Sequence, residues 1–232
     1  MAQLLLIHGA FQGSWIWRDL RPVLSALGHF SHAPTLTGCG YLHHGPVPSA
    51  DIATYAADVV NYAAFKEATD LVLVAHSFSG LTCAAALMQA GAPFRRAVFV
   101  DAVIPQGRSS FAELAGEGFQ KMLAANKTED GQVNPWPAQV FGVPESAWGW
   151  FGSRLRPFPL SAFTAPFPRD FDPAALPISF ITCTQTVAPF IRAQAGRAAS
   201  LGWPVAELAS GHCPFVTHPK ELAALIDSAI KG

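Results

Sequence analysis

The chain is poor in charged residues and in cysteine, and it has no long apolar run. Only 13% of its 232 residues are charged and the formal net charge is −1, so no attraction to nucleic acid or to an anionic membrane surface is expected. No apolar run reaches the roughly 20 residues of a membrane-spanning helix. The cysteines show neither the C-x-x-C spacing of a metal or redox site nor a disulfide framework; they are Cys39, Cys83, Cys183 and Cys213.

Hydrophobic residues, by contrast, make up half of the chain. A chain of this length and composition can bury a large core without disulfides or metals. The first strand is expected to begin by Gln3, which leaves no room for the charged and apolar regions of a secretion signal. The neighbouring His43 and His44 have no third ligand at a suitable spacing. We therefore expect a cytoplasmic protein that binds no metal, nucleic acid or membrane. Its oligomeric state stays open, a homodimer included.

Short apolar runs alternate with helical patterns along most of the chain. Strands that are apolar throughout suit a parallel sheet covered on both faces, and their alternation with helices is typical of βαβ units. We predict an α/β protein with a doubly wound, mostly parallel six-stranded sheet. The expected strands are Leu4–Ile7, His29–Ala33, Asp70–Ala75, Ala97–Val100, Ile178–Cys183 and Val205–Leu208; the expected helices are Trp15–Leu27, Ile52–Glu67, Ser77–Ala90, Pro189–Leu201 and Pro219–Ile230.

One stretch, from about residue 105 to 176, interrupts the alternation and is rich in proline, phenylalanine and tryptophan. A structureless loop of that length is unusual inside a compact domain. We predict that residues 105–176 form an inserted lid, partly helical near Phe111–Ala125, and that residues 1–104 and 177–232 form the core. A second small hydrophobic core is the other interpretation of the same aromatic residues.

The run over residues 71–80 places a serine directly after a buried strand. Four apolar residues are followed by Ala75-His76-Ser77-Phe78-Ser79, and a helical pattern begins at once. A strand-to-helix turn this tight lifts the Ser77 hydroxyl above the sheet, as in a nucleophile elbow. The usual pattern, G-x-S-x-G, has glycine where this chain has Ala75 and Ser79, which are the next smallest residues. The alternative is that Ser77 only caps the helix.

A nucleophilic serine needs a base and a site for the negative charge that develops in the reaction. His212 follows the last expected strand and so lies at the sheet edge where open α/β sheets react with ligands, as Ser77 does. The order serine, acid, histidine is that of one lineage of catalytic triads. A glycine-bearing turn over residues 8–15 follows the first strand and leaves main-chain N–H groups free. We expect the N–H groups of Ala10 and Phe78 to form an oxyanion hole.

Together these motifs resemble the α/β-hydrolase superfamily. The block H-G-A-x-x-G-S-W at residues 8–15, the serine elbow and Gly211-His212 are similar to the branch of plant methyl-ester esterases, hydroxynitrile lyases and their bacterial relatives. The resemblance implies the α/β-hydrolase fold, with residues 3–7 in the position of its third strand, and acyl-type chemistry without a metal or organic cofactor. Hydroxynitrile lyases of this branch carry threonine at the position of Gly9 and lysine at that of Cys213, so this chain favours hydrolysis.

The acid of the triad departs from this pattern. The resemblance places the acid after the penultimate strand, where residues 183–189 of this chain contain no carboxylate. Asp101, at the end of the strand after the elbow strand, is the remaining candidate, an arrangement similar to that of pancreatic-type lipases. Its role would be to fix the tautomer of His212 and to stabilise the imidazolium. A turn cap, or an ion pair with Arg108, is the alternative for Asp101.

The sequence therefore predicts an esterase or lactonase that cleaves a small, apolar or aromatic carboxylic ester through an acyl-enzyme. Its catalytic residues would be Ser77, His212 and Asp101. Two alternatives stay open: a ligand-binding protein of this fold with impaired catalysis, and a lyase similar to the hydroxynitrile lyases. The aromatic residues of the lid would form an apolar pocket. The candidate pocket residues are His8, Phe11, Trp136 and Trp148.

Overall fold

Six short apolar segments pair into one parallel sheet in the computed structural model, which describes residues 1–44 and 49–232. Every pairing in this sheet is parallel, and the strand order is β2-β1-β3-β4-β7-β8. All residues of β3 and β7 are buried, because helices cover both faces of the sheet. The predicted α/β fold is confirmed. The strands are β1 (Gln3–Ile7), β2 (Phe30–His32), β3 (Leu71–His76), β4 (Phe94–Val100), β7 (Ile178–Cys183) and β8 (Val205–Leu208).

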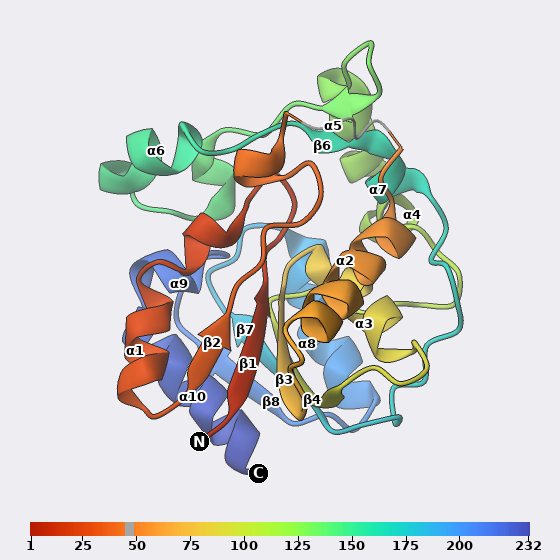
Figure 1. The fold of residues 1–232 in the computed structure, drawn as a ribbon. Helices are drawn as coiled ribbons and strands as arrows, with labels where there is room; N and C mark the ends of the chain where they lie inside the picture. The colour runs from red at the N-terminus through yellow and green to blue at the C-terminus, as the bar shows by residue number, and fades with distance from the viewer. Residues whose placement is uncertain (45–48) are drawn as a thin grey trace.

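The helices form a layer on each face of the sheet (Figure 1). One layer holds α1, α9 and α10, and the other holds α2, α3 and α8. Within residues 1–44 and 49–232, no helix has the length and apolarity that a membrane crossing requires. The helices of the two layers, with two short 3-10 turns, are η1 (Ser14–Trp17), α1 (Leu20–Ala26), η2 (Gly40–Leu42), α2 (Ile52–Phe65), α3 (Ser79–Leu87), α8 (Pro189–Ser200), α9 (Pro214–Thr217) and α10 (Pro219–Lys231).

The prediction of one continuous helix over Trp15–Leu27 is wrong, because the structure has two separate helices there, η1 and α1. Pro22 lies in the first turn of α1. Its ring would collide with the carbonyl of Arg18 if one helix ran through both, and it has no N–H for the helical bond. The break lets Trp17 turn inward, where it is fully buried.

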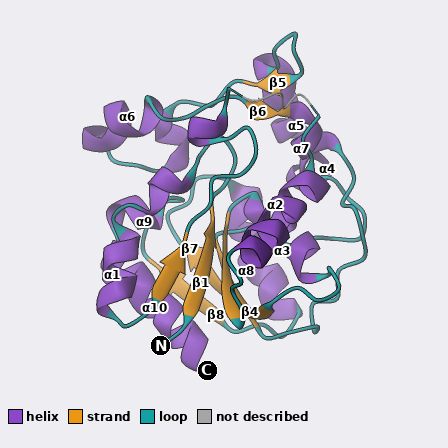
Figure 2. Ribbon diagram, in the orientation of Figure 1, coloured by secondary structure: helices purple, strands orange, loops and turns teal. Residues whose placement is uncertain are grey.

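Residues 105–176 are called the lid segment below. Its helices and its two short strands lie over the carboxyl ends of the sheet strands, and its last residues return to the start of β7 at the opposite end (Figure 2). The helix expected near Phe111–Ala125 is present as two helices, separated at Gly116, whose φ of 83° ends the first of them. The boundaries of the lid segment stay a prediction. Its elements are α4 (Phe111–Ala115), α5 (Glu117–Asn126), β5 (Gln132–Val133), η3 (Ala138–Phe141), α6 (Glu145–Gly152), β6 (Phe158–Pro159) and α7 (Leu160–Thr164).

Aromatic rings of the lid segment pack on the start of α3. Phe78 contacts Phe158 and Phe163 with ring centroids 5.1 and 5.5 Å apart, and both contacts are edge-on. These rings are buried. Edge-on contacts of this kind contribute about 0.5–1.5 kcal/mol each beyond the burial of their area. The lid segment is therefore held on the sheet edge by apolar packing directly beside Ser77.

A buried histidine joins the first strand to the chain that follows β2. The His8 ring is fully buried; its Nδ1–H donates to the Gly9 carbonyl at 2.9 Å and its Nε2 accepts from the Leu36 N–H at 3.1 Å. Burial lowers the pKa of His8 from 6.5 to about 4, against the opposing effect of the bond to Gly9. The ring is therefore neutral in the folded protein at neutral pH.

The His8 site predicts a loss of stability on acidification. Between pH 6.5 and about 4 the unfolded chain binds a proton at His8 that the folded protein does not, so the free energy of unfolding falls as pH decreases through this range. The full loss is roughly 3 kcal/mol. Urea unfolding of the wild type and of His8→Asn across this range measures it; we expect a shallower pH dependence in the variant, and equal slopes would contradict the assignment.

Candidate active site

Ser77 occupies the turn between β3 and α3 in a left-handed backbone conformation, with φ of 58°. Its N–H donates to the Val100 carbonyl at 3.3 Å, and its own carbonyl accepts from Gly80 and Val103 at 3.1 and 3.0 Å. A non-glycine residue held in this region costs of order 1–3 kcal/mol and persists only where its surroundings impose it. Here the hydrogen bonds of Ser77 to β4 and to the chain after β4 hold this left-handed conformation, as a nucleophile elbow requires.

The two departures from the G-x-S-x-G pattern have structural explanations. Ala75 lies within β3, paired with Ile7 on one side and Phe99 on the other. Ser79 is buried, and its hydroxyl donates to the His8 carbonyl in a short hydrogen bond. The close approach that excludes a side chain falls one residue later, at Gly80, where a Cβ would lie 2.2 Å from the Val103 carbonyl oxygen.

His212 lies between Ser77 and Asp101. Its Nδ1 is 2.7 Å from Asp101 Oδ2 and its Nε2 is 2.8 Å from Ser77 Oγ. Because a buried carboxylate only accepts hydrogen bonds, Nδ1 carries the proton and Nε2 accepts from the serine hydroxyl. The three predicted catalytic side chains thus form one hydrogen-bonded chain, with the geometry that general-base activation of a serine requires.

Asp101 is fully buried directly after β4, also in a left-handed conformation, with φ of 48°. Its N–H donates to the Ile181 carbonyl at 2.8 Å, which holds it against β7. Its carboxylate accepts from Cys183 N–H at 3.0 Å, from Thr186 Oγ1 at 2.5 Å and from His212. Arg108 is not among these partners, so the alternative of an ion pair with that residue is wrong.

The oxyanion hole expected from the sequence would use main-chain N–H groups of the turn after β1 and of the elbow. The Gln12 side chain accepts from the Gly9 N–H at 3.1 Å, and Phe11 is left-handed with φ of 67°. Within the described residues, the N–H groups of Ala10 and Phe78 donate to no acceptor. Both residues line the cavity that also contains Ser77 and His212. This placement is the one expected of an oxyanion hole.

His76 is a part of the site that the sequence analysis missed. Its Nε2–H donates to the main-chain carbonyl of His212 at 2.8 Å, and the two rings are 4.7 Å apart. Burial, and then the neighbouring His212, hold the pKa of His76 well below its usual value, so the ring is neutral. It therefore anchors the backbone of the base. The position of His76 directly before the serine was the available signal.

A second anchor of the base comes from the lid segment. Gly142, with φ of 67°, packs so closely on Gly211 that a Cβ on Gly211 would lie 2.6 Å from the Gly142 carbonyl oxygen. A Cβ on Gly142 would lie 3.0 Å from the His212 nitrogen. The main chain of the lid segment thus touches the loop that carries the base, and neither position has room for a side chain.

The cavity above Ser77 has a volume of about 490 Å³ and an apolar wall. Phe11 and Trp136 line it, as expected, but His8 and Trp148 do not, and these two expectations are wrong. The His8 ring is buried beneath the turn and bonded to Leu36, while Trp148 on α6 donates to the Val143 carbonyl at 3.0 Å. The wall residues that were not among the four named candidates include Phe111, Phe119, Met122, Phe141, Phe163 and Phe190.

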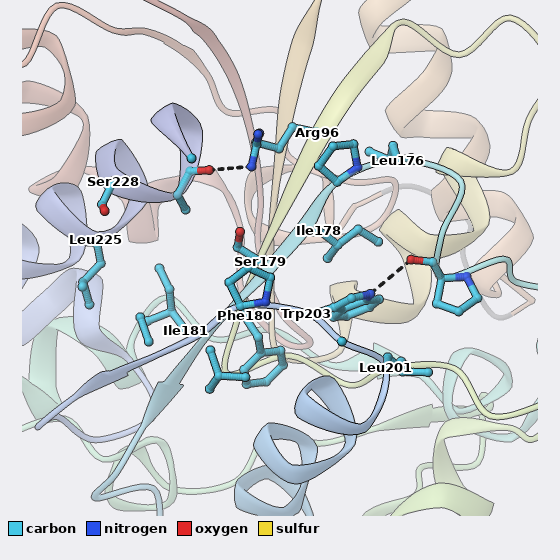
Figure 3. Close-up of a pocket in the computed structure, with 18 of the residues that line it drawn as sticks. Arg96, Leu176, Ile178, Ser179, Phe180, Ile181, Leu201, Trp203, Leu225 and Ser228 are labelled. Carbon is cyan, nitrogen blue, oxygen red and sulfur yellow. Dashed lines mark hydrogen bonds between the residues drawn. The ribbon is translucent and has the colours of Figure 1, made fainter.

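A larger cavity of about 620 Å³ lies elsewhere, at the opposite end of β7 and β8 (Figure 3). Two of its polar side chains are bonded within the protein: Arg96 donates to the Ala229 carbonyl at 2.9 Å and Trp203 to the Pro173 carbonyl at 3.1 Å. It contains neither Ser77 nor His212. Geometry, rather than cavity size, therefore identifies the candidate active site.

Comparison with known proteins agrees with this geometry. Residues 4–225 match the model of the alpha/beta hydrolase family, so the chain belongs to that family. A carbendazim hydrolyzing esterase of Nocardioides sp. (strain SG-4G) is 26% identical over 96% of this chain and 97% of its own length. Methylesterase 2 of Arabidopsis thaliana is 33% identical, over 46% of this chain and 41% of its own length. These relatives confirm the predicted branch of plant esterases and their bacterial relatives.

The fold is also that of a solved relative. An extracellular alpha/beta-hydrolase from a Paenibacillus species superimposes with a TM-score of 0.85, covering 99% of both chains at 21% sequence identity. At 21% sequence identity, this similarity shows that the two folds are alike. Because it covers 99% of both chains, it includes the lid segment as well as the sheet.

The contact at Gly80 predicts that a single methyl group disturbs the elbow. In Gly80→Ala the new Cβ must displace the Val103 main chain, and overpacking of this kind costs about 1–3 kcal/mol. Thermal and urea unfolding measure the loss, and any ester turnover should fall with it. Gly118→Ala is the matched control, because a Cβ at that helical glycine meets nothing within 4 Å. Equal stability of the two variants would contradict the prediction.

Proposed function

We propose that this α/β-hydrolase cleaves a small carboxylic ester with an apolar or aromatic part, using Ser77 as nucleophile, His212 as base and Asp101 as acid. Ester hydrolysis as the reaction class follows from the family and its esterase relatives. The observation that carries the finer proposal is the continuous hydrogen-bonded chain from Asp101 Oδ2 through the imidazole to Ser77 Oγ.

The first half of the reaction would acylate the serine. Ser77 Oγ attacks the carbonyl carbon while His212 Nε2 takes its proton, and the carbonyl π electrons move to the oxygen. The N–H groups of Ala10 and Phe78 stabilise this oxyanion; one such donor is typically worth about 3 kcal/mol of the barrier. The C–O bond to the alcohol then breaks, and the imidazolium returns its proton to the leaving oxygen.

The second half would release the acid. Water takes the place of the alcohol, gives a proton to His212 Nε2 and adds to the acyl carbon. The ester bond to Ser77 breaks, the serine recovers the proton, and a carboxylic acid leaves. One ester and one water yield one acid and one alcohol, so no oxidant, metal or organic cofactor enters the balance. Asp101 holds the productive tautomer and stabilises the imidazolium in both halves.

The cavity supports a neutral, apolar substrate. His212 is the only titratable side chain among the described residues that line it, and the remainder of the wall is mainly aromatic and aliphatic. A charged group on the substrate would lose its hydration there without gaining a partner. The carbendazim hydrolyzing esterase and the methylesterase relatives are named for esterase activities, which agrees with this class.

The contacts of Gly9 and Cys213 argue against the lyase alternative. A Cβ on Gly9 would lie 3.0 Å from the Ser77 Cβ, so the threonine of the lyases has no room without moving the nucleophile. Cys213, in place of the lyases' lysine, is buried against Gln12. A cysteine side chain is neutral or negative, never positive, and burial holds the pKa of this thiol well above its usual value, so Cys213 is neutral and does not replace the lysine charge that holds cyanide in the lyases. The alternative of a ligand-binding protein with impaired catalysis loses its motive, since Asp101 would fill the role of the missing late acid.

Two substitutions test the proposed roles. We expect Ser77→Ala to lose all measurable ester turnover and all covalent labelling by a fluorophosphonate, with the wild-type label mapped to residue 77. Asp101→Asn should keep the nucleophile but lower kcat by up to roughly 10⁴-fold, because the imidazole then loses its productive tautomer. Undiminished turnover in Ser77→Ala would exclude the mechanism, and an unaffected Asp101→Asn would remove that residue from the triad.

A matched pair of esters tests the substrate class. p-Nitrophenyl hexanoate and the p-nitrophenyl half-ester of adipic acid differ chiefly in a terminal carboxylate, which lies too far from the ester carbonyl to attack it readily. We expect kcat/KM to be at least about 100-fold lower for the charged ester, because no wall residue compensates the lost hydration. The rates of alkaline hydrolysis of the two esters serve as the control for intrinsic reactivity. A similar kcat/KM for the two esters would contradict the proposed class of neutral, apolar substrates.

A further inference from the structure

The turn after β7 carries one buried hydroxyl among exposed residues. Thr184, Gln185 and Val187 are exposed, whereas Thr186 is only 2% exposed. The turn is fixed by hydrogen bonds from Gln185 N–H to the Ser210 carbonyl at 3.0 Å and from Thr186 N–H to the Cys183 carbonyl at 3.1 Å. These main-chain hydrogen bonds therefore fix the turn in a conformation that points the Thr186 side chain into the protein.

The Thr186 hydroxyl contacts the same carboxylate oxygen as the base. Its Oγ1 lies 2.5 Å from Asp101 Oδ2, and His212 Nδ1 lies 2.7 Å from that oxygen. A carboxylate accepts only, so Thr186 donates. Cys183 N–H occupies Oδ1 at 3.0 Å, and two of the three donors to Asp101 therefore come from the chain at and after the end of β7.

We propose that Thr186 is a positioning residue of the catalytic apparatus, and this inference rests on the proposed function. Its hydroxyl fixes the direction of Asp101 Oδ2 toward His212 and withdraws part of the negative charge from that oxygen. Hydrogen bonds to charged groups are short and strong, as this one is. Thr186 thus limits how firmly Asp101 holds the protonated imidazole.

The pH dependence of the serine reaction is the signature of this role. Without the Thr186 donor, Asp101 Oδ2 holds the imidazolium more strongly, so the pH below which activity falls should rise. Within the part of the chain that the structure describes, the other titratable groups beside the imidazole or beside Asp101 are His76 and the thiols of Cys183 and Cys213. Burial lowers the pKa of His76 and raises those of both thiols, so all three stay neutral and unchanged in a Thr186 variant.

The experiment compares three substitutions in the full chain. Thr186→Val keeps the shape and removes the hydroxyl, Thr186→Ser keeps the hydroxyl, and Thr184→Val changes an exposed threonine of the same turn. The rate of Ser77 labelling by a fluorophosphonate, measured between about pH 5 and pH 9, needs no knowledge of the natural substrate. kcat and KM on p-nitrophenyl butyrate are measured beside it.

For Thr186→Val we expect labelling and kcat to fall about 10- to 100-fold, with KM within about twofold of the wild type and the acid limb of both profiles moved to higher pH. Thr186→Ser and Thr184→Val should behave as the wild type. An unmoved acid limb in Thr186→Val, or the same loss in Thr186→Ser as in Thr186→Val, overturns the inference. Retained labelling of Ser77→Ala would instead overturn the proposed function, so the two failures are distinguishable.

Discussion

The rest of the site depends on one arrangement, in which the imidazole of His212 is held between a buried carboxylate and a serine hydroxyl. Asp101 is fully buried, and a charge in that position is tolerated only when hydrogen bonds replace its lost hydration. Its partners are a main-chain N–H, a threonine hydroxyl and the base. The sheet therefore supplies the environment that lets a carboxylate remain where the chemistry needs it.

Backbone strain is concentrated at the same place. Among the described residues, five non-glycine residues have positive φ, and three of them are Phe11, Ser77 and Asp101. Each follows the carboxyl end of a central strand, β1, β3 or β4, within a few residues. Parallel strands end side by side, so one sheet edge brings together three strained turns, and hydrogen bonds to neighbouring strands hold Ser77 and Asp101 in theirs.

The sheet and the three polar side chains could be predicted because each leaves a local pattern. Continuous apolar runs identify buried parallel strands, and Ser77, Asp101 and His212 each follow such a run. The positions of His8 and Trp148 could not be predicted, because a residue near the site in sequence can turn its side chain away. The helices and strands of the lid segment could not be predicted in detail either, because they depend on aromatic contacts between residues far apart in the sequence, such as Phe78 with Phe158. His76 and Thr186 were missed for the same reason: their partners, His212 and Asp101, lie in loops that follow other strands.

The contact between Gly142 and Gly211 joins the roof of the cavity to the loop beneath it, backbone to backbone. Two glycines in direct apposition leave no flexible side chain to absorb a displacement. If the roof lifts to admit a molecule, the histidine loop loses its support on that side until the roof is seated again. The position of the lid segment and the position of the proton acceptor are therefore coupled through this one backbone contact.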